Sequence, residues 1–169
     1  MARRTRQLPP PPSPEAPTVE DAPPAPSVDM VDTTLLRTLV GYNTRRASLS
    51  IIAVFMERMA VYDLKVVDFS VLSLVAHNPG ITSRQLCATL NVLPPNLVGL
   101  IAALERRGLI ERRPHPSDGR AMGVHLTPTG AELTQQAEQT AAQLEEDATA
   151  RLTAAERKTL IRLLQKVYD

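Results

Sequence analysis

The chain has 169 residues, a formal net charge of +1 and a single cysteine. That length suffices for one domain with a sizeable core, and one cysteine excludes an internal disulfide framework. No stretch of the roughly 18 apolar residues that span a membrane occurs, and no apolar segment follows the N-terminal arginines as in a secretory signal. We therefore expect a cytoplasmic protein without a membrane partner.

Charge is distributed unevenly along the chain. Residues 84–120 contain six arginines and three acidic residues, whereas residues 121–150 contain five acidic residues and no lysine or arginine. A molecule with one basic end and one acidic end would be oriented on a polyanion.

Residues 1–31 are predicted to be a disordered, proline-rich tail. Nine of the fifteen prolines lie in the first thirty residues, and bulky apolar side chains are nearly absent there. Two interpretations stay open: a solvated tail without a defined role, or an arm that brings Arg3, Arg4 and Arg6 onto DNA phosphates.

A long helix is predicted for residues 32–62, beginning at Asp32, Thr33 or Thr34 and continuing to about Val61. Two sets of apolar residues recur along it at helical spacing. The first set comprises Leu35, Leu39, Tyr42, Leu49, Ile52, Met56 and Met59, and the second comprises Leu36, Val40, Ile51, Val54 and Phe55. A helix that is apolar on two faces needs two partners, one of them outside its own lobe.

Three shorter helices are predicted next, and the last two form a helix–turn–helix. The first covers Val66 to His77. Ser83 to Leu90 and Pro94 to Arg107 each carry one apolar stripe and are separated by a break at 91–94. Prolines suit the first turn of a helix, and Gly108 is a typical terminator.

Two strands follow, Leu109 to Arg113 and Ala121 to Leu126, and the link Pro114–Arg120 is expected to project as a mobile loop. Helix–turn–helix followed by a β-ribbon describes a winged helix, so we predict a mainly α (α+β) fold whose residues 63–127 form a DNA-binding lobe. The arginines around this link are either phosphate-binding or part of an ordinary solvated loop.

Residues 128–169 are predicted to form two more helices. Thr127 and Pro128 are suited to the N-cap and first position of a helix that continues to about Arg151. Residues 153–156, Thr-Ala-Ala-Glu, form a capping box that opens the last helix.

Two segments resemble the MarR family of multiple-antibiotic-resistance regulators. GLIERRPHPSDGRAMGVHLTPTG is similar to the family's wing signature, through Asp118, Arg120, Leu126, Thr127 and Gly130, and NVLPPNLVGLIAALERRG is similar to its recognition helix. The resemblance extends weakly over Thr33 to Asp169. Many relatives carry Ser or Thr as the helix N-cap where Leu93 stands here, and Pro94-Pro95 can compensate by presetting φ.

The resemblance implies a homodimer whose dimerisation region combines the first helix with the last two. An intramolecular helical bundle is the alternative. In the homodimer, the two recognition helices would enter successive major grooves of a pseudo-palindromic operator in double-stranded DNA. We assign base reading to Pro95, Asn96, Val98 and Gly99, of which Asn96 has a hydrogen-bond pattern suited to adenine. Phosphate contacts are assigned to Ser83, Arg84, Arg112, Arg113 and Arg120, and Asp118 can hold the Arg120 guanidinium in place.

Family members often bind small phenolic or aromatic acids, so the resemblance implies a repressor released by a small ligand. The candidate ligand-binding residues are Tyr42, Arg46, Phe55, Met59, Tyr62 and Phe69. An ordinary core would use the same aromatic residues, and Arg46 could equally face solvent. Two alternatives are a redox-sensing regulator acting through Cys87, which otherwise is a buried small residue, and a winged helix used as a protein-interaction module.

No catalytic constellation is present. The three histidines lack metal-ligand spacing, and the glycines are explained as turns and helix ends. We expect no enzyme activity, no metal and no cofactor.

Overall fold

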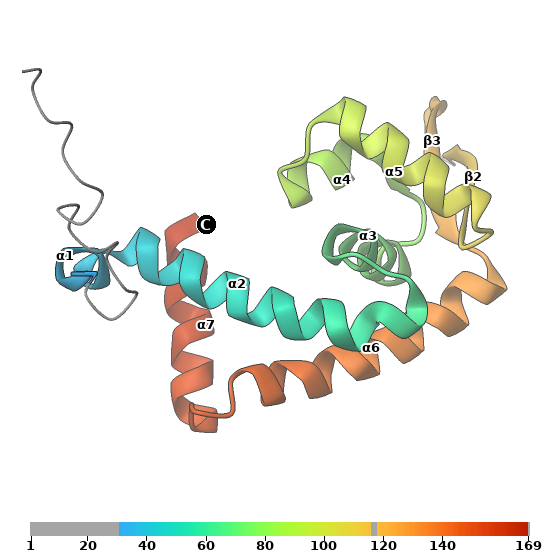
Figure 1. Ribbon diagram of the computed structural model, residues 1–169. Coiled ribbons are helices and arrows are strands. Elements are labelled where there is room, and N and C mark those ends of the chain that lie inside the picture. Colours follow the sequence, from blue (N-terminus) through green and yellow to red (C-terminus); the bar gives the residue numbers. More distant parts are fainter. Residues whose placement is uncertain (1–30, 116–117, 169) are drawn as a thin grey trace, which may run out of the picture.

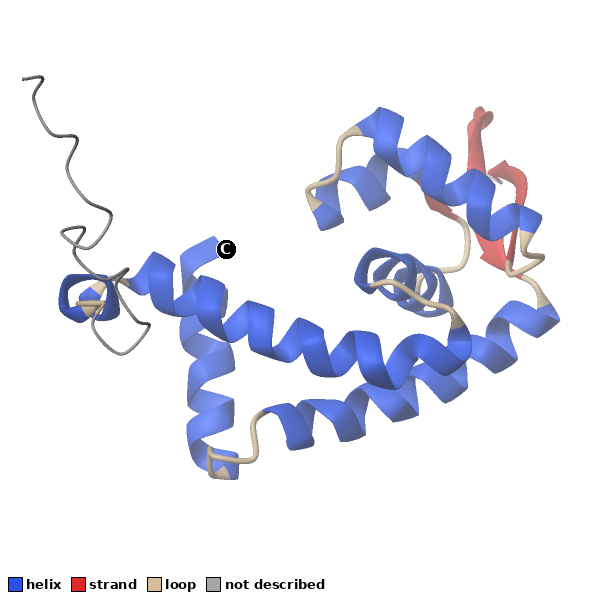
Figure 2. Ribbon diagram, in the orientation of Figure 1, coloured by secondary structure: helices blue, strands red, loops and turns tan. Residues whose placement is uncertain are grey.

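The computed structural model describes residues 31–115 and 118–168, so residues 1–30 of the predicted tail lie outside it. Figure 1 shows α2 and α6 as long helices, with α1 and α7 at one end of the molecule and the small sheet, α4 and α5 at the other. Figure 2 places all strands in this one region, beside two short helices. No single helix among the described residues is long and apolar enough to cross a membrane.

The predicted first helix is interrupted. It consists of α1 (Thr34–Thr38), α2 (Val40–Met59) and a 3-10 turn, η3 (Ala60–Tyr62). Leu39 between α1 and α2 is extended, with φ −91° and ψ 128°. The Asn43 side chain bridges the break, because its Nδ2 donates to the carbonyls of Arg37 and Leu39, both at 2.8 Å. The Arg37 carbonyl at the end of α1 thereby gains a partner, whereas the Leu39 carbonyl also accepts the Asn43 backbone N–H at 3.2 Å.

Helix α3 (Val66–His77) has the predicted bounds and packs against α2 and α6. Its first turn is closed by Asp68, whose carboxylate accepts the Lys65 backbone N–H at 3.0 Å. Val71, Leu72 and Val75 on its inner face are buried. These residues lie in the shared core of the protein, so α3 connects the long helices to the winged lobe.

The helix–turn–helix consists of α4 (Ser83–Leu90) and α5 (Pro94–Arg106), which meet at 115°. The prediction of both helices is confirmed, with α5 one residue shorter. Asn91 makes the turn in the left-handed region, at φ 50°. A two-residue strand, β1 (Ile81–Thr82), precedes α4 and was not predicted. Two residues are too few to show an alternating pattern, so β1 exists only through its pairing with another strand.

The sheet has the order β1-β3-β2, with β2 (Ile110–His115) and β3 (Asp118–Leu126) antiparallel. The predicted seven-residue loop Pro114–Arg120 is therefore wrong, because only residues 116–117 separate the strands. The pairing continues past Pro114 through a shift in register between Pro114 and His115. Proline is compatible with β2 because β2 is an edge strand.

The C-terminal part comprises α6 (Pro128–Ala148) and α7 (Ala154–Tyr168). Helix α6 ends at Ala148 rather than near Arg151. It packs along α2 and α3, and an ion pair of 2.9 Å joins Arg58 of α2 to Asp147. The predicted capping box of α7 is confirmed, since Glu156 Oε2 accepts the Thr153 N–H at 2.8 Å. Helix α7 stands apart from the α2–α6 pair and crosses near the N-terminal half of α2 (Figure 1).

The core lies between the C-terminal half of α2, α3, α6 and the winged lobe. Its fully or nearly fully buried apolar residues include Phe55, Met59, Leu72, Leu86, Leu97, Ile101, Leu104, Ile110, Val124, Ala137 and Leu144. Helix α1, the N-terminal half of α2 and α7 contribute no buried residue. Most of the predicted apolar seam is therefore exposed in a single chain.

Candidate nucleic-acid interface

Helix α5 presents an exposed face built from small and short side chains. Pro95, Asn96, Val98 and Gly99 are exposed, and Val98 retains 62% of its surface. A Cβ added at Gly99 would meet nothing within 4 Å. The opposite face buries Leu97, Ile101 and Leu104, which hold α5 against the core. No long side chain among the four exposed residues keeps a partner surface away from the α5 backbone.

The start of α5 is stabilised without a polar cap. Leu93 is extended at the N-cap position, with φ −66° and ψ 139°, and makes no side-chain cap. Pro94 and Pro95 occupy the first turn and carry no N–H, so fewer donors need a partner there. The Asn96 N–H donates to the Leu93 carbonyl at 3.0 Å. Pro94 and Pro95 lie at the first helical positions as predicted, and their compensation for the missing cap stays a prediction.

Ser83 and Arg84 lie exposed in the first turn of α4, at the end of α4 that follows strand β1. The capping box before them is complete. The Thr82 Oγ1 accepts the Gln85 N–H at 3.3 Å, and Gln85 Oε1 accepts the Thr82 N–H at 2.9 Å. A capped helix start with an exposed Ser and Arg is suited to binding an anion such as phosphate.

Two arginines of the wing, Arg112 and Arg113, form ion pairs that the sequence did not predict. Arg112 Nη2 donates to Glu105 Oε2 of α5 at 2.8 Å, and Arg113 pairs with Glu111 on the same strand face. Exposed ion pairs contribute only about 0–1 kcal/mol, so a phosphate can replace either carboxylate. The backbone of Asp118 and Arg120 belongs to β3. Their side chains lie outside the described part of the structure, so the predicted contact between them stays a prediction.

The C-terminal end of α5 is tied to two other parts of the chain. Gly108, at φ 69°, ends the helix, and the Leu109 N–H donates to the Leu104 carbonyl at 3.1 Å. Arg107 donates to the carbonyls of Asp63 and Tyr62 at 2.8 and 2.9 Å. No local sequence signal points to this contact, which joins residues 44 positions apart.

The Leu-Thr-x-x-Gly part of the wing signature joins α6 to this same end of α5. Thr127 Oγ1 donates to the Gly108 carbonyl at 2.6 Å, and the Thr127 N–H donates to the Leu109 carbonyl at 3.1 Å. A Cβ on Gly130 would lie 1.8 Å from the Leu109 carbonyl oxygen. Glycine at position 130 is therefore required for α6 to approach the start of the wing.

Four of the six candidate ligand residues lie in or against the core, whereas Tyr42 and Arg46 lie in the other half of α2. Phe55 and Met59 are core residues, and the Phe55 ring meets Phe69 edge-on at 5.6 Å. The Tyr62 hydroxyl hydrogen-bonds Thr140 Oγ1 of α6 at 2.9 Å. Tyr42 lies 13 residues before Phe55 on the same helix, about 20 Å away, and Arg46 is exposed in the same half of α2. Phe55 and Phe69 are therefore part of the core packing.

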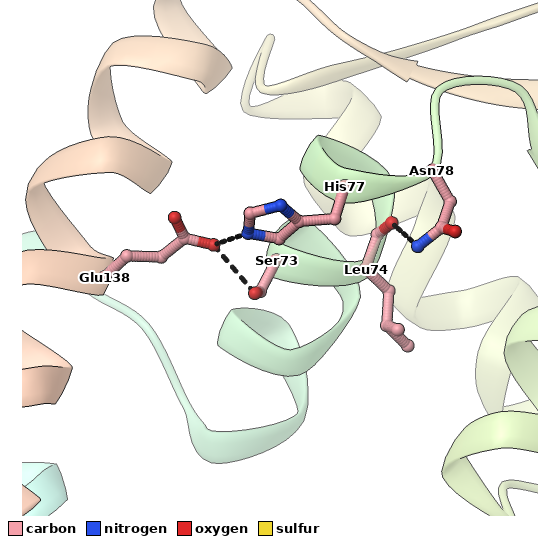
Figure 3. A network of polar contacts seen from close by, with 5 residues as sticks. All are labelled: Ser73, Leu74, His77, Asn78 and Glu138. Atoms are coloured by element: carbon pink, nitrogen blue, oxygen red, sulfur yellow. Dashed lines mark hydrogen bonds and ion pairs between the residues drawn. The ribbon is translucent and has the colours of Figure 1, made fainter.

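Polar side chains also join α3 to α6 (Figure 3). Glu138 Oε1 accepts a hydrogen bond from Ser73 Oγ at 2.8 Å and lies 3.0 Å from His77 Nε2. Cys87 on α4 is half-buried and packs against the core. No group of three or more His, Cys, Asp and Glu side chains in the described residues is placed to hold a metal ion.

Comparison with known proteins gives consistent relatives. A family model described as the MarR family matches residues 62–121. A Thauera aromatica protein named as a regulator of the hcr operon is 36% identical over 100 residues, 59% of this chain, and the chain spans only 60% of that protein. The Salmonella typhimurium multiple antibiotic resistance protein MarR is 37% identical over 106 residues, 62% of this chain and 74% of that protein.

Solved structures extend the similarity to nearly the whole described fold. The transcriptional repressor CouR bound to a 23-mer DNA duplex has a TM-score of 0.75 and 33% identity, over 82% of this chain and 99% of CouR. CouR bound to p-coumaroyl-CoA has a TM-score of 0.73 and 31% identity, over 81% and 96%. Because these relatives share both the sequence and the winged-helix architecture, the chain belongs to the MarR family of transcriptional regulators.

Proposed function

We propose that this chain is a homodimeric, DNA-binding repressor that reads a pseudo-palindromic operator with two copies of α5. The exposed face of α5 carries the proposal. Its residues 95–99 combine one amide side chain, Asn96, with small neighbours that allow close approach to base edges. Arg84 of α4 and the arginines of the wing strands would supply cations for phosphates beside the bases that α5 reads.

The exposed apolar surface of α1, α2 and α7 supports the dimer. It is lined by Leu35, Leu39, Val40, Leu49, Ile52, Met56, Leu160, Ile161, Leu163, Leu164 and Val167. A groove of about 750 Å³ lies between α2 and α7. Monomeric proteins rarely expose a contiguous apolar patch above a few hundred Å². A second copy covers this surface and sets the two recognition helices roughly 34–36 Å apart, one turn of DNA.

The proposed effector is a small aromatic or phenolic molecule. CouR, which binds p-coumaroyl-CoA, offers a precedent among the structural relatives. Of the candidate ligand residues Tyr42, Arg46, Phe55, Met59, Tyr62 and Phe69, the buried group around Phe55 and Phe69 would need to open to admit a ligand. Such a ligand lowers DNA affinity only if it binds better to dimers whose recognition helices do not match adjacent grooves.

Selection from random duplexes with the purified protein, followed by binding measurements at several salt concentrations, tests the proposal. We expect an inverted repeat, and a fall in affinity with a log–log slope of about −0.9 per phosphate contacted. Asn96→Ala should cost about 1–3 kcal/mol per half-site and relax the preference at one base pair. Gln135→Ala removes an exposed amide from α6 and serves as the control.

A selection without an enriched motif, combined with salt-independent binding, would favour the protein-interaction module instead. A regulator that responds to oxidants through Cys87 predicts a different result, namely a normal operator and a response that Cys87→Ser abolishes.

A further inference from the structure

The C-terminal end of α5 is the point where the recognition helix meets both long helices of the proposed dimerisation region. On one side, Thr127 at the start of α6 bonds to the carbonyls of Gly108 and Leu109. On the other side, Arg107 bonds to the end of η3, which continues α2. The opposite end of α5, with Asn96, is the end that reads DNA in the proposed function.

The Arg107 contact is well suited to set an angle. Two nitrogens of one rigid, planar guanidinium donate to two successive carbonyls, those of Tyr62 and Asp63. Asp63 is left-handed at φ 50° and ends η3. Tyr62 in turn reaches α6 through its hydroxyl, at 2.9 Å from Thr140 Oγ1. One side chain of α5 is thus connected to α2 directly and to α6 through Tyr62.

A small rotation at this end has a large effect at the other. Helix α5 has 13 residues and is therefore about 20 Å long. A tilt of about 10° around the C-terminal end moves the N-terminal residues by about 3.4 Å, the rise of one base pair. In a two-fold dimer both recognition helices tilt, so the distance between them responds to the sum of the two movements.

We propose that Arg107 is a positioning residue that fixes the angle between α5 and α2 and so determines which half-site spacing the dimer accepts. This inference rests on the proposed function, since it requires a dimer that binds an inverted repeat.

Loss of the Arg107 contact should leave the fold intact. Leu97, Ile101 and Leu104 still bury α5 in the core, and the bonds of Thr127 still hold its end. The carboxylate of Asp63 contributes little, because it lies 3.8 Å from the guanidinium and its side chain is 95% exposed. What disappears is the pair of directional bonds that oppose rotation of α5.

The test compares half-site spacing in selections from random duplexes by full-length wild type, Arg107→Met, Arg107→Lys and Arg106→Met. Arg106→Met is the matched control, because it removes the same charge from the adjacent position. The Arg106 side chain donates to the Ala102 carbonyl within α5. We expect wild type and Arg106→Met to enrich one spacing. Arg107→Met should enrich several neighbouring spacings with the same half-site sequence. Its affinity for the wild-type operator should fall about tenfold.

Arg107→Lys should be intermediate, because an ammonium reaches one carbonyl in place of two. A merely structural role would lower the melting temperature and weaken all duplexes alike, without broadening the spacing. If Arg107→Met folds and enriches only the half-site spacing of the wild type, the inference is overturned. If Arg107→Met does not fold, the same result for folded Arg107→Lys overturns it. A wild-type protein that enriches no inverted repeat refutes the proposed function itself, and the inference with it.

Discussion

The Gly130→Ala substitution tests how α6 is joined to the winged lobe. The added Cβ would lie 1.8 Å from the Leu109 carbonyl oxygen and 2.7 Å from the Leu109 carbonyl carbon. Both atoms belong to the backbone at the start of the wing, so no side chain can rotate away. To restore ordinary contact at 3.4 Å, α6 must retreat by about 1.6 Å, the difference between these distances.

That movement breaks both bonds of Thr127, which now measure 2.6 Å to the Gly108 carbonyl and 3.1 Å to the Leu109 carbonyl. Each is worth about 1 kcal/mol. Strain from overpacking adds about 1–3 kcal/mol, and the better helix propensity of alanine returns about 1 kcal/mol. We expect Gly130→Ala to lower the free energy of unfolding by about 2–4 kcal/mol, a large share of the 5–15 kcal/mol typical of a domain.

Urea unfolding followed by circular dichroism measures this change, since the chain contains no tryptophan. All variants are compared at one protein concentration because dimerisation makes stability depend on concentration. Gly99→Ala is the matched control, with open space around its added Cβ. It should gain up to about 1 kcal/mol of stability. If Gly130→Ala lowers the free energy of unfolding by less than about 1 kcal/mol, α6 does not approach the Leu109 backbone so closely.

Four further expectations concern single sites. Leu72→Ala should lower the free energy of unfolding, measured in urea, by about 2–5 kcal/mol because Leu72 has no exposed surface. A change near zero would contradict that burial. Leu93→Ser should stabilise α5 by about 1 kcal/mol by adding the missing N-cap, which a raised urea midpoint would show. The backbone and side-chain hydrogen bonds of Thr153 lower the pKa of Glu156. Because the pKa is lowered in the folded state, ionised Glu156 stabilises α7 above the ordinary Glu pKa of about 4.3, and this stabilisation is lost as pH falls through the folded-state pKa. The loss of helicity on acidification, measured by circular dichroism, should therefore be smaller in Glu156→Gln than in the wild type. Cys87 should react with iodoacetamide much more slowly in native protein than in urea, and equal rates would revive the redox alternative.

Much of this protein was determined by local sequence. The bounds of α3 and α4 and the start of α5 follow from apolar spacing, and the capping box at Thr153 marks the start of α7 as predicted. The capping box at Thr82 marks the start of α4 in the same way, although it was not predicted. Gly108 ends α5 for the same kind of reason. These signals act within one turn of helix, so they are visible in the sequence without knowledge of the tertiary structure.

Only the tertiary structure decided the remaining features. Strand β1 and the length of the wing depend on pairing with β3, and a strand gains its hydrogen bonds from a distant partner. Phe55 and Phe69 belong to the core because α3 folds back onto α2. The bonds from Arg107 to Tyr62 and Asp63 join segments far apart in sequence, and no residue pattern near position 107 encodes where that guanidinium points. Helix formation is local, whereas the angle at which one helix meets another is set by contacts that exist only after the chain has folded.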